Sequence, residues 1–173
     1  MNADGTGIRV ASGEWSYDGT NNTIDCDGHG TATASLAGGR TLGTAPNATL
    51  HAIRACNCSG QAQIGDIIGA LNYVALNAIR PVVISMSVGT TGISDSLQLA
   101  GNNIVSLYNL RIVASAGNDG TDSRTTTPAR SVYVDAIAAS DVNDNRPLFS
   151  NHGKCVNAYA PGEDVMVASK VSL

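Results

Sequence analysis

The most constraining feature of the sequence is the alternation of short apolar runs with longer amphipathic segments. Residues 49–54, 82–87 and 111–116 are rich in Val, Ile and Ala and are bounded by turn-forming residues, as buried strands of a parallel sheet are. A fourth β-rich run covers residues 132–138. Strands that alternate with helices imply right-handed crossovers, so the sequence predicts a three-layer α/β domain with a mainly parallel sheet.

Three segments between these runs carry the signals of helices. In residues 64–78 apolar side chains recur at spacings of three, four and seven and form one face. Residues 94–110 are a second candidate, with Ser94 as the N-cap. The apolar face of this second segment is formed by Leu97, Ile104 and Leu107. A shorter Ala-rich helix is expected over residues 30–37, where two glycines end it.

Composition and charge exclude several classes of function. The chain carries ten Lys and Arg against fourteen Asp and Glu, so it has no electrostatic footprint for nucleic acid. Hydrophobic residues make up 43% of the chain, which argues against disorder. No apolar run reaches the roughly 18 residues that a membrane span needs. We expect no nucleic-acid partner, no membrane partner and a monomeric state.

The cysteines and the glycosylation sequons favour a secreted or extracytoplasmic protein. The four cysteines are Cys26, Cys56, Cys58 and Cys155. Their spacing does not fit a zinc site, but it is compatible with one or two disulfides in an oxidising compartment. Sequons begin at Asn21, Asn47 and Asn57 and fit the same route.

The two ends of the sequence give an expectation about its extent. Residues 1–7 contain no basic region followed by an apolar core, so no signal peptide is expected within the chain. Residues 165–173 form an apolar stretch with no polar tail. We therefore expect residues 1–173 to be part of a domain that is incomplete at both ends.

Three polar segments lie where the predicted sheet would expose chemistry, outside the carboxyl ends of strands or at a helix start. His29, between two glycines, could act as a general base or simply be a surface residue. Asn118 could stabilise an oxyanion, although Asn-Asp-Gly is also a strong turn former. Ser87, Val88 and Gly89 could pair with an extended peptide, or they could simply be the end of a core strand that stops at a glycine.

Taken together, these segments resemble the subtilisin-like serine proteases, and most of all the proteinase K and aqualysin branch. The similar motifs follow in the family's order over nearly the whole chain. They are Gly28-His29-Gly30-Thr31 and residues 43–48, 84–89, 113–118, 127–129, 134–141, 149–151 and 160–162. The resemblance implies a subtilisin-like α/β fold and a serine-type endopeptidase that acts on an extended peptide or protein.

The resemblance also implies roles for individual residues. It makes His29 the general base and Asn118 the oxyanion-hole donor. The residues that would pair with the substrate backbone are Ser87, Val88 and Gly89. The residues that would line the primary specificity pocket are Ser115, Ala116 and Gly117.

Three structural features are implied by the same resemblance. Cys26 and Cys58 fit the positions of a disulfide, and a cis peptide bond is expected before Pro128. Cys155 resembles a cysteine of a second bridge whose partner would lie beyond residue 173, and Cys56 has no assigned role. Calcium is possible by family, but no acidic cluster has ligand-like spacing, so no cofactor and no metal site is assigned.

The sequence departs from the family pattern at the two other catalytic positions. The nucleophile motif Gly-Thr-Ser-x-Ala does not occur in it. The family's Asp-Thr-Gly aligns with Gly5-Thr6-Gly7, so Gly5 stands at the position of the acid, and the neighbouring Asp4 would point to the opposite face of a strand. Ala32 replaces the second histidine of His-Gly-Thr-His. Loss of one triad residue costs about 10⁴ to 10⁶ in turnover in subtilisin itself, so we expect this chain alone to be inactive.

Two hypotheses from different classes remain. The first is a secreted endopeptidase of which this chain is an inactive fragment, and it rests on His29 and Asn118. The second is a non-catalytic pseudoprotease that binds extended peptides at residues 87–89, and it rests on Gly5 and Ala32. A nucleotide-binding interpretation of residues 5–7 is weak, because the run lacks the remaining glycine spacing.

Overall fold

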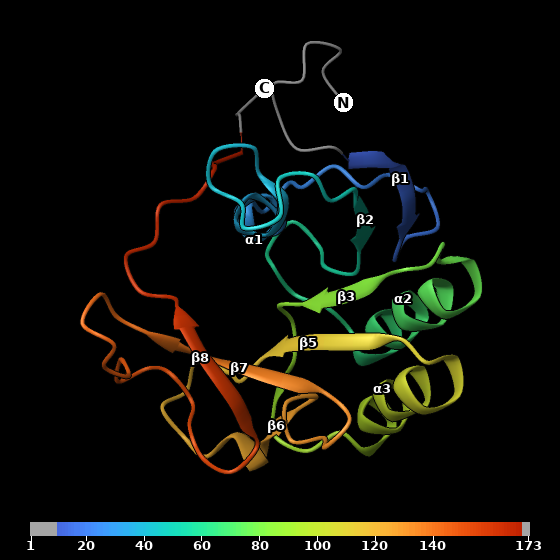
Figure 1. Cartoon of the computed structure of the whole chain (residues 1–173). Coiled ribbons are helices and arrows are strands. Elements are labelled where there is room, and N and C mark those ends of the chain that lie inside the picture. Colours follow the sequence, from blue (N-terminus) through green and yellow to red (C-terminus); the bar gives the residue numbers. More distant parts are fainter. Residues whose placement is uncertain (1–9, 171–173) are drawn as a thin grey trace. The chain divides into compact units, whose positions relative to one another are not determined.

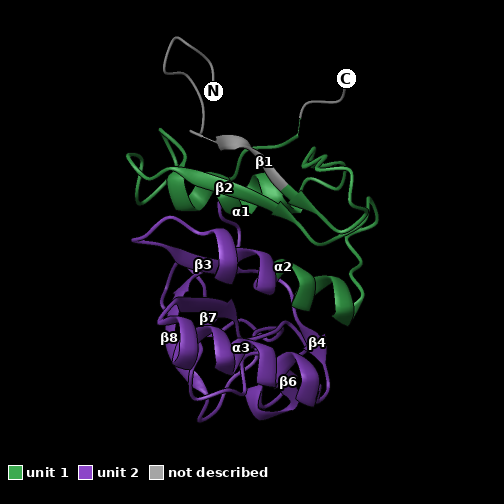
Figure 2. Ribbon diagram, turned by 90° about the vertical axis from the view of Figure 1, so that its right-hand side faces the viewer, with its two compact units in different colours: residues 1–70, 166–173 green, residues 71–165 purple. Residues whose placement is uncertain are grey.

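The computed structural model describes residues 10–170. The chain divides into two compact units, one formed by Met1–Ala70 with Met166–Leu173 and the other by Leu71–Val165 (Figure 2). Strands and helices alternate along the chain (Figure 1), so the predicted α/β class with a parallel sheet is confirmed. None of the helices in the described part is long and apolar enough to cross a membrane.

The unit Leu71–Val165 is built on a four-stranded parallel sheet in the order β3-β5-β7-β8. The strands are β3 (Val83–Met86), β5 (Arg111–Ser115), β7 (Asp135–Ser140) and β8 (Val156–Pro161). Alternate residues of the central strands are buried, with Ile112 and Ala136 both fully inaccessible. A Cβ on Gly101 of the neighbouring helix would lie 3.8 Å from Ile112 Cδ1, so this glycine lets the helix approach the sheet closely.

That helix, α3 (Asp95–Tyr108), begins as the sequence predicts and buries part of the expected face. The Ser94 hydroxyl accepts a hydrogen bond from the Leu97 N–H at 3.4 Å, which caps the first turn. Leu97 and Ile104 are buried, whereas Leu107 is 73% exposed. At 100° per residue Leu107 lies about 80° away from Leu97 around the helix axis, outside the buried stripe, so its assignment to the apolar face is wrong.

Two strands of this four-stranded sheet differ from the sequence prediction. The strand expected from residue 132 begins at Asp135, because a turn precedes it in which the Val134 N–H donates to the Ser131 carbonyl. Val132 in this turn is 93% exposed, so its β-branched side chain was a misleading signal. Strand β8 was not predicted. It lies at the edge of the sheet, and its exposed positions do not alternate.

The same unit contains a short antiparallel pair. It joins β4 (Thr90–Thr91) to β6 (Thr126–Thr127), which follows the 3₁₀ turn η1 (Ser123–Thr125). The Thr127–Pro128 peptide bond is cis, as the resemblance implied, and the Arg80–Pro81 bond is cis as well.

The other unit contains β1 (Val10–Ser16), α1 (His29–Gly38), β2 (Leu50–Arg54) and the first part of α2 (Ile64–Asn77). β1 and β2 pair in parallel, with an irregularity in register between Ala11 and Trp15. A Cβ on Gly69 of α2 would lie 3.3 Å from Trp15 Cζ2. The helix therefore packs closely against the indole ring at this point.

The burial pattern of α3 predicts a large difference between two leucines. Leu97→Ala should lower the free energy of unfolding by about 2–5 kcal/mol, because it opens a cavity at a fully buried position. The matched variant Leu107→Ala should change it by no more than about 0.5 kcal/mol. Urea unfolding of both variants and the parent chain measures this, and equal losses would contradict the described packing.

Candidate functional site

The loop before α1 holds His29 at the first residue of the helix. Gly28 has a φ of 107°, in the left-handed region that favours glycine. The Asp25 carboxylate accepts hydrogen bonds from the N–H groups of Gly28 at 2.8 Å and Thr31 at 2.6 Å, and Asp27 accepts from the His29 N–H at 3.1 Å. Carboxylates therefore accept hydrogen bonds from three N–H groups at the start of the helix, those of Gly28, His29 and Thr31.

The His29 side chain is exposed. No side chain among residues 10–170 forms a hydrogen bond with its imidazole ring. The positions compared with the family's acid, Gly5 and Asp4, lie outside the described residues. Within the described residues, the His29 ring is therefore exposed and has no carboxylate partner, so it is accessible to act as a base or an acid.

The electrostatics of this loop centre on Asp25. Burial raises the pKa of its carboxyl, but the hydrogen bonds from Gly28 and Thr31 outweigh burial, so the pKa lies below its ordinary value. Asp25 is therefore ionised at neutral pH. A negative charge at the start of α1 is also favoured by the helix dipole.

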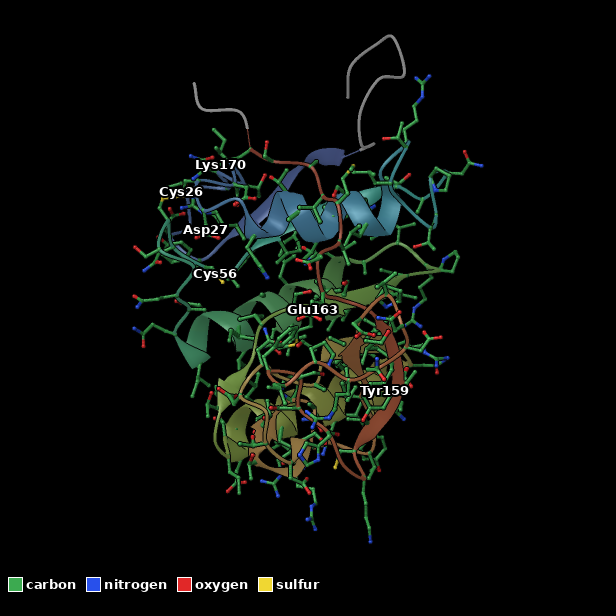
Figure 3. All side chains as sticks on the ribbon, turned by 90° about the vertical axis from the view of Figure 1, so that its left-hand side faces the viewer. Cys26, Asp27, Cys56, Tyr159, Glu163 and Lys170 are labelled. Atoms are coloured by element: carbon green, nitrogen blue, oxygen red, sulfur yellow. A yellow bond between two sulfur atoms is a disulfide. The ribbon has the colours of Figure 1, made fainter. Side chains whose placement is uncertain are left out.

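A disulfide between Cys26 and Cys58 fixes the same loop, the pairing expected from the resemblance. The Arg54 guanidinium donates to Cys26 Sγ at 3.3 Å and to Cys58 Sγ at 3.5 Å. The Lys170 ammonium donates to the Cys26 carbonyl, and Figure 3 shows Lys170 and Cys26 near each other. The chain before His29 is therefore held by a covalent bond and two cations.

Cys56 carries a free thiol in this region. Burial, and then the negative charges of Asp27 and Asp25, raise its pKa. A thiol with a raised pKa is a poor nucleophile at neutral pH, because the thiolate is the reactive form. Cys56 is therefore not a candidate for the missing nucleophile.

In the other unit, the loop after β5 is organised around the buried side chain of Asn151. Its Oδ1 accepts from the N–H groups of Asp119 and Thr121, both at 3.0 Å. Its Nδ2 donates to the Ala116 carbonyl at 3.0 Å and to Thr126 Oγ1 at 2.9 Å. Asn151 is fully inaccessible to solvent, so one side chain ties the end of β5, the following loop and β6 together.

Gly117 has to be glycine in this arrangement. Its φ is 106°, and a Cβ at this position would lie 2.2 Å from Asn151 Nδ2. Asn118 follows directly, with an exposed side chain that forms no hydrogen bond within the described residues. The sharp turn at Gly117 thus leaves the Asn118 amide free to donate to a ligand.

Asn118 borders a hollow of about 250 Å³ at the carboxyl ends of three strands of the sheet. The side chains lining the hollow are small or apolar, apart from one hydroxyl and one amide. They belong to Ser115, Gly117, Asn118, Ile137, Ala138, Ala139, Phe149, Ala160, Pro161 and Gly162. This volume is smaller than the roughly 300–1,000 Å³ of a typical small-molecule site, and it suits a single side chain.

The structure thus brings Ser115, Gly117 and Asn118 together around one hollow. Ala116, expected to line a pocket with them, is not among the lining residues and is fully buried. Ala116 was assigned to the pocket by its place in the motif, but its carbonyl accepts a hydrogen bond from the Asn151 side chain.

Ser87, Val88 and Gly89 follow β3 as chain that belongs to no strand, with Ser87 and Gly89 exposed. A Cβ on Gly89 would lie 2.7 Å from the Thr127 carbonyl oxygen, so a side chain is sterically excluded there. These residues do not line the hollow. Their position after a strand leaves them suited to backbone pairing with an added peptide.

Sequence reasoning missed Asn151 and Asp25 as functional residues. Asn151 stands in the motif 149–151, but nothing local marks it as buried. Asp25 lies four residues before His29, outside the usual N-cap position, which is occupied by Gly28. As to metals, no group of three His, Cys, Asp or Glu side chains within residues 10–170 could hold an ion.

Known proteins resemble the chain over nearly its whole length. The model of the subtilase family matches residues 3–172. The extracellular serine proteinase of Thermus sp. (strain Rt41A) is 38% identical over 144 residues, which are 83% of this chain and 35% of the relative. Alkaline serine exoprotease A of Vibrio alginolyticus is 33% identical over 165 residues, 94% of this chain and 30% of the relative.

A solved structure, that of a cold adapted subtilisin-like serine proteinase, matches with a TM-score of 0.89 and 32% sequence identity. The match covers 95% of this chain and 63% of the solved one. The chain therefore spans about a third of the length of the two curated relatives and less than two thirds of the solved protein.

The hydrogen bonds of Asp25 predict a pH-dependent contribution to stability. Asp25→Ala should lower the free energy of unfolding by about 0.5–2 kcal/mol at pH 7, the usual cost of losing a helix cap. Because the pKa of Asp25 in the folded state is lowered, its contribution is fully present above the ordinary value near 3.9. It disappears as the pH falls through the folded-state pKa. Urea unfolding between pH 7 and pH 2 measures the difference.

Glu163→Ala is the matched control, since it removes the same charge from an exposed side chain without a hydrogen bond in the described structure. Its effect should stay within about 0.5 kcal/mol. The difference in the free energy of unfolding between Asp25→Ala and the parent chain should become smaller as the pH is lowered. A difference that stays constant would refute the capping role.

Proposed function

The chain belongs to the subtilase family, and we propose that the protein containing it is a secreted serine-type endopeptidase of extended peptides or proteins. The observation that carries this proposal is the free side-chain amide of Asn118, which lies at the rim of a small hollow on a loop anchored by the buried Asn151. Preorganised donors of this kind stabilise the charge that develops during peptide hydrolysis. Two curated relatives are named as a serine proteinase and a serine exoprotease, which supports the same reaction class.

Each candidate residue has one role in the proposed reaction. His29 takes the proton of the attacking hydroxyl and later gives it to the leaving amine. Asn118 donates a hydrogen bond to the oxyanion of the tetrahedral intermediate. Ser87, Val88 and Gly89 pair with the substrate backbone as an added strand. His29, Asn118, Ser87 and Gly89 are exposed and Val88 is half-buried, so a substrate can reach these segments.

The sequence contains no Gly-Thr-Ser-x-Ala motif, so this proposal assigns the role of nucleophile to no residue of the chain. In this proposal the nucleophile comes from residues outside 1–173, and the chain alone does not hydrolyse peptides. The disulfide between Cys26 and Cys58 and the name of the extracellular Thermus relative support secretion.

The test is made on the native product that contains these residues. It should react with a serine-directed fluorophosphonate and hydrolyse a chromogenic peptide, whereas residues 1–173 alone should do neither. His29→Ala in the native product should lower kcat on the order of 10⁶-fold, a magnitude measured for subtilisin itself. His51→Ala, a second exposed histidine of the same unit, is the control and should retain activity.

The alternative of a peptide-binding pseudoprotease gives the opposite result. A native product that binds peptides saturably, but is neither labelled nor active, would establish binding without turnover and would refute the endopeptidase proposal.

The small volume of the hollow predicts that it accepts one substrate side chain of limited bulk. Ala139→Leu adds bulk at its wall, so kcat/KM for a substrate with a bulky apolar side chain should fall about 10-fold or more. A substrate with glycine at the same position is the control and should be hydrolysed nearly as before. Equal losses for both substrates would show that the hollow does not select a side chain.

A further inference from the structure

We propose that Asn151 is a positioning residue for Asn118, fixing the loop so that the Asn118 amide is aimed before the oxyanion forms. The inference rests on the proposed function, because it requires Asn118 to be the oxyanion donor. Asn151 itself is fully buried and touches no substrate. Its contribution would pass entirely through the geometry of residues 116–121.

The hydrogen bonds of the Asn151 side chain bracket Asn118. On one side, Nδ2 donates to the carbonyl of Ala116, two residues before Asn118. On the other side, Oδ1 accepts from the N–H groups of Asp119 and Thr121. The Asn151 side chain thus holds the loop two residues before and one residue after Asn118, whose side-chain amide must be aimed.

Backbone contacts complete the clamp. The Asn151 N–H donates to the Gly117 carbonyl at 3.0 Å, and the Gly120 N–H donates to the Phe149 carbonyl at 2.6 Å. Within the described structure, residues 116–121 therefore all bond to residues 149–152, with the single exception of Asn118. A loop held at every residue but one is rigid around a free side chain.

The Asn151 amide has no spare hydrogen-bonding capacity. Its two N–H donors and the two lone pairs of its oxygen are all used. A buried amide in this state has one favourable orientation, because any rotation leaves buried groups unpaired. Stabilisation of an oxyanion depends on a hydrogen-bond donor that is already correctly oriented. A donor that has to reorient during the reaction stabilises the transition state less.

The test is a double-mutant cycle in the native protein. Asn118→Ala should lower kcat about 10²–10³-fold, a magnitude known from subtilisin, a member of this family. Asn151→Ala should lower kcat at least about 10-fold and change KM by less than about 3-fold, as expected for a loss confined to the transition state. In the Asn118→Ala background, Asn151→Ala should cost no more than about 2-fold, because its effect passes through a side chain already removed.

Two further variants separate positioning from general stability. Ser131→Ala is the matched control, since Ser131 is buried and its hydroxyl bonds to Asn102 and to the Tyr133 N–H, away from the loop. It should lower the melting temperature and leave kcat unchanged. Should Asn151→Ala fail to fold, Thr126→Val removes one acceptor of the Asn151 amide and should give a smaller fall in kcat with the same dependence on Asn118.

The outcomes distinguish this inference from the proposed function. If Asn118→Ala loses activity and Asn151→Ala does not, or if Asn151→Ala costs the same factor in both backgrounds, the positioning role alone is overturned. If the parent protein has no peptidase activity, or if Asn118→Ala keeps full kcat, the proposed function itself is refuted. The positioning role of Asn151 is then refuted as well, because it depends on that function.

Discussion

The buried amide of Asn151 is the interaction on which the candidate oxyanion site depends. The chain has to leave β5 through a sharp turn. In such a turn, backbone N–H and C=O groups lose the hydrogen-bond partners that a neighbouring strand would otherwise provide. Asn151 replaces the missing ladder partners of Ala116, Asp119 and Thr121. The requirement extends to Gly117, where any side chain would collide with the same amide. The turn, the glycine and the asparagine are therefore one structural unit.

The segment around His29 solves the same physical problem with charge and a covalent bond. The start of α1 also leaves N–H groups without helical partners, and the carboxylates of Asp25 and Asp27 satisfy them. The disulfide of Cys26 lies between these two carboxylates in the sequence. An exposed imidazole is thus carried on a backbone whose own polar groups are engaged, which is the condition for holding a reactive group in one place.

What the sequence predicted, and what it did not, follows from the range of the interactions. Ser94 as the cap of α3 is a local signal and was predicted, because the hydroxyl and the N–H that it accepts from are three residues apart. Strand β8 and the role of Asn151 depend on partners 20 to 35 residues away, and no local pattern encodes them. The disulfide and the cis bond before Pro128 were available only through resemblance to a family.

Small residues couple stability to function at the carboxyl ends of the strands. The hollow exists because Ser115, Gly117, Ala139 and Gly162 carry little or no side chain. A Cβ on Gly162 would already lie 2.8 Å from the Cβ of Ala139, and one on Gly117 would displace Asn151. A larger residue at either glycine would therefore disturb packing as well as change the space for a ligand. Close packing at the sheet end and an open site therefore both require small side chains at the same residues.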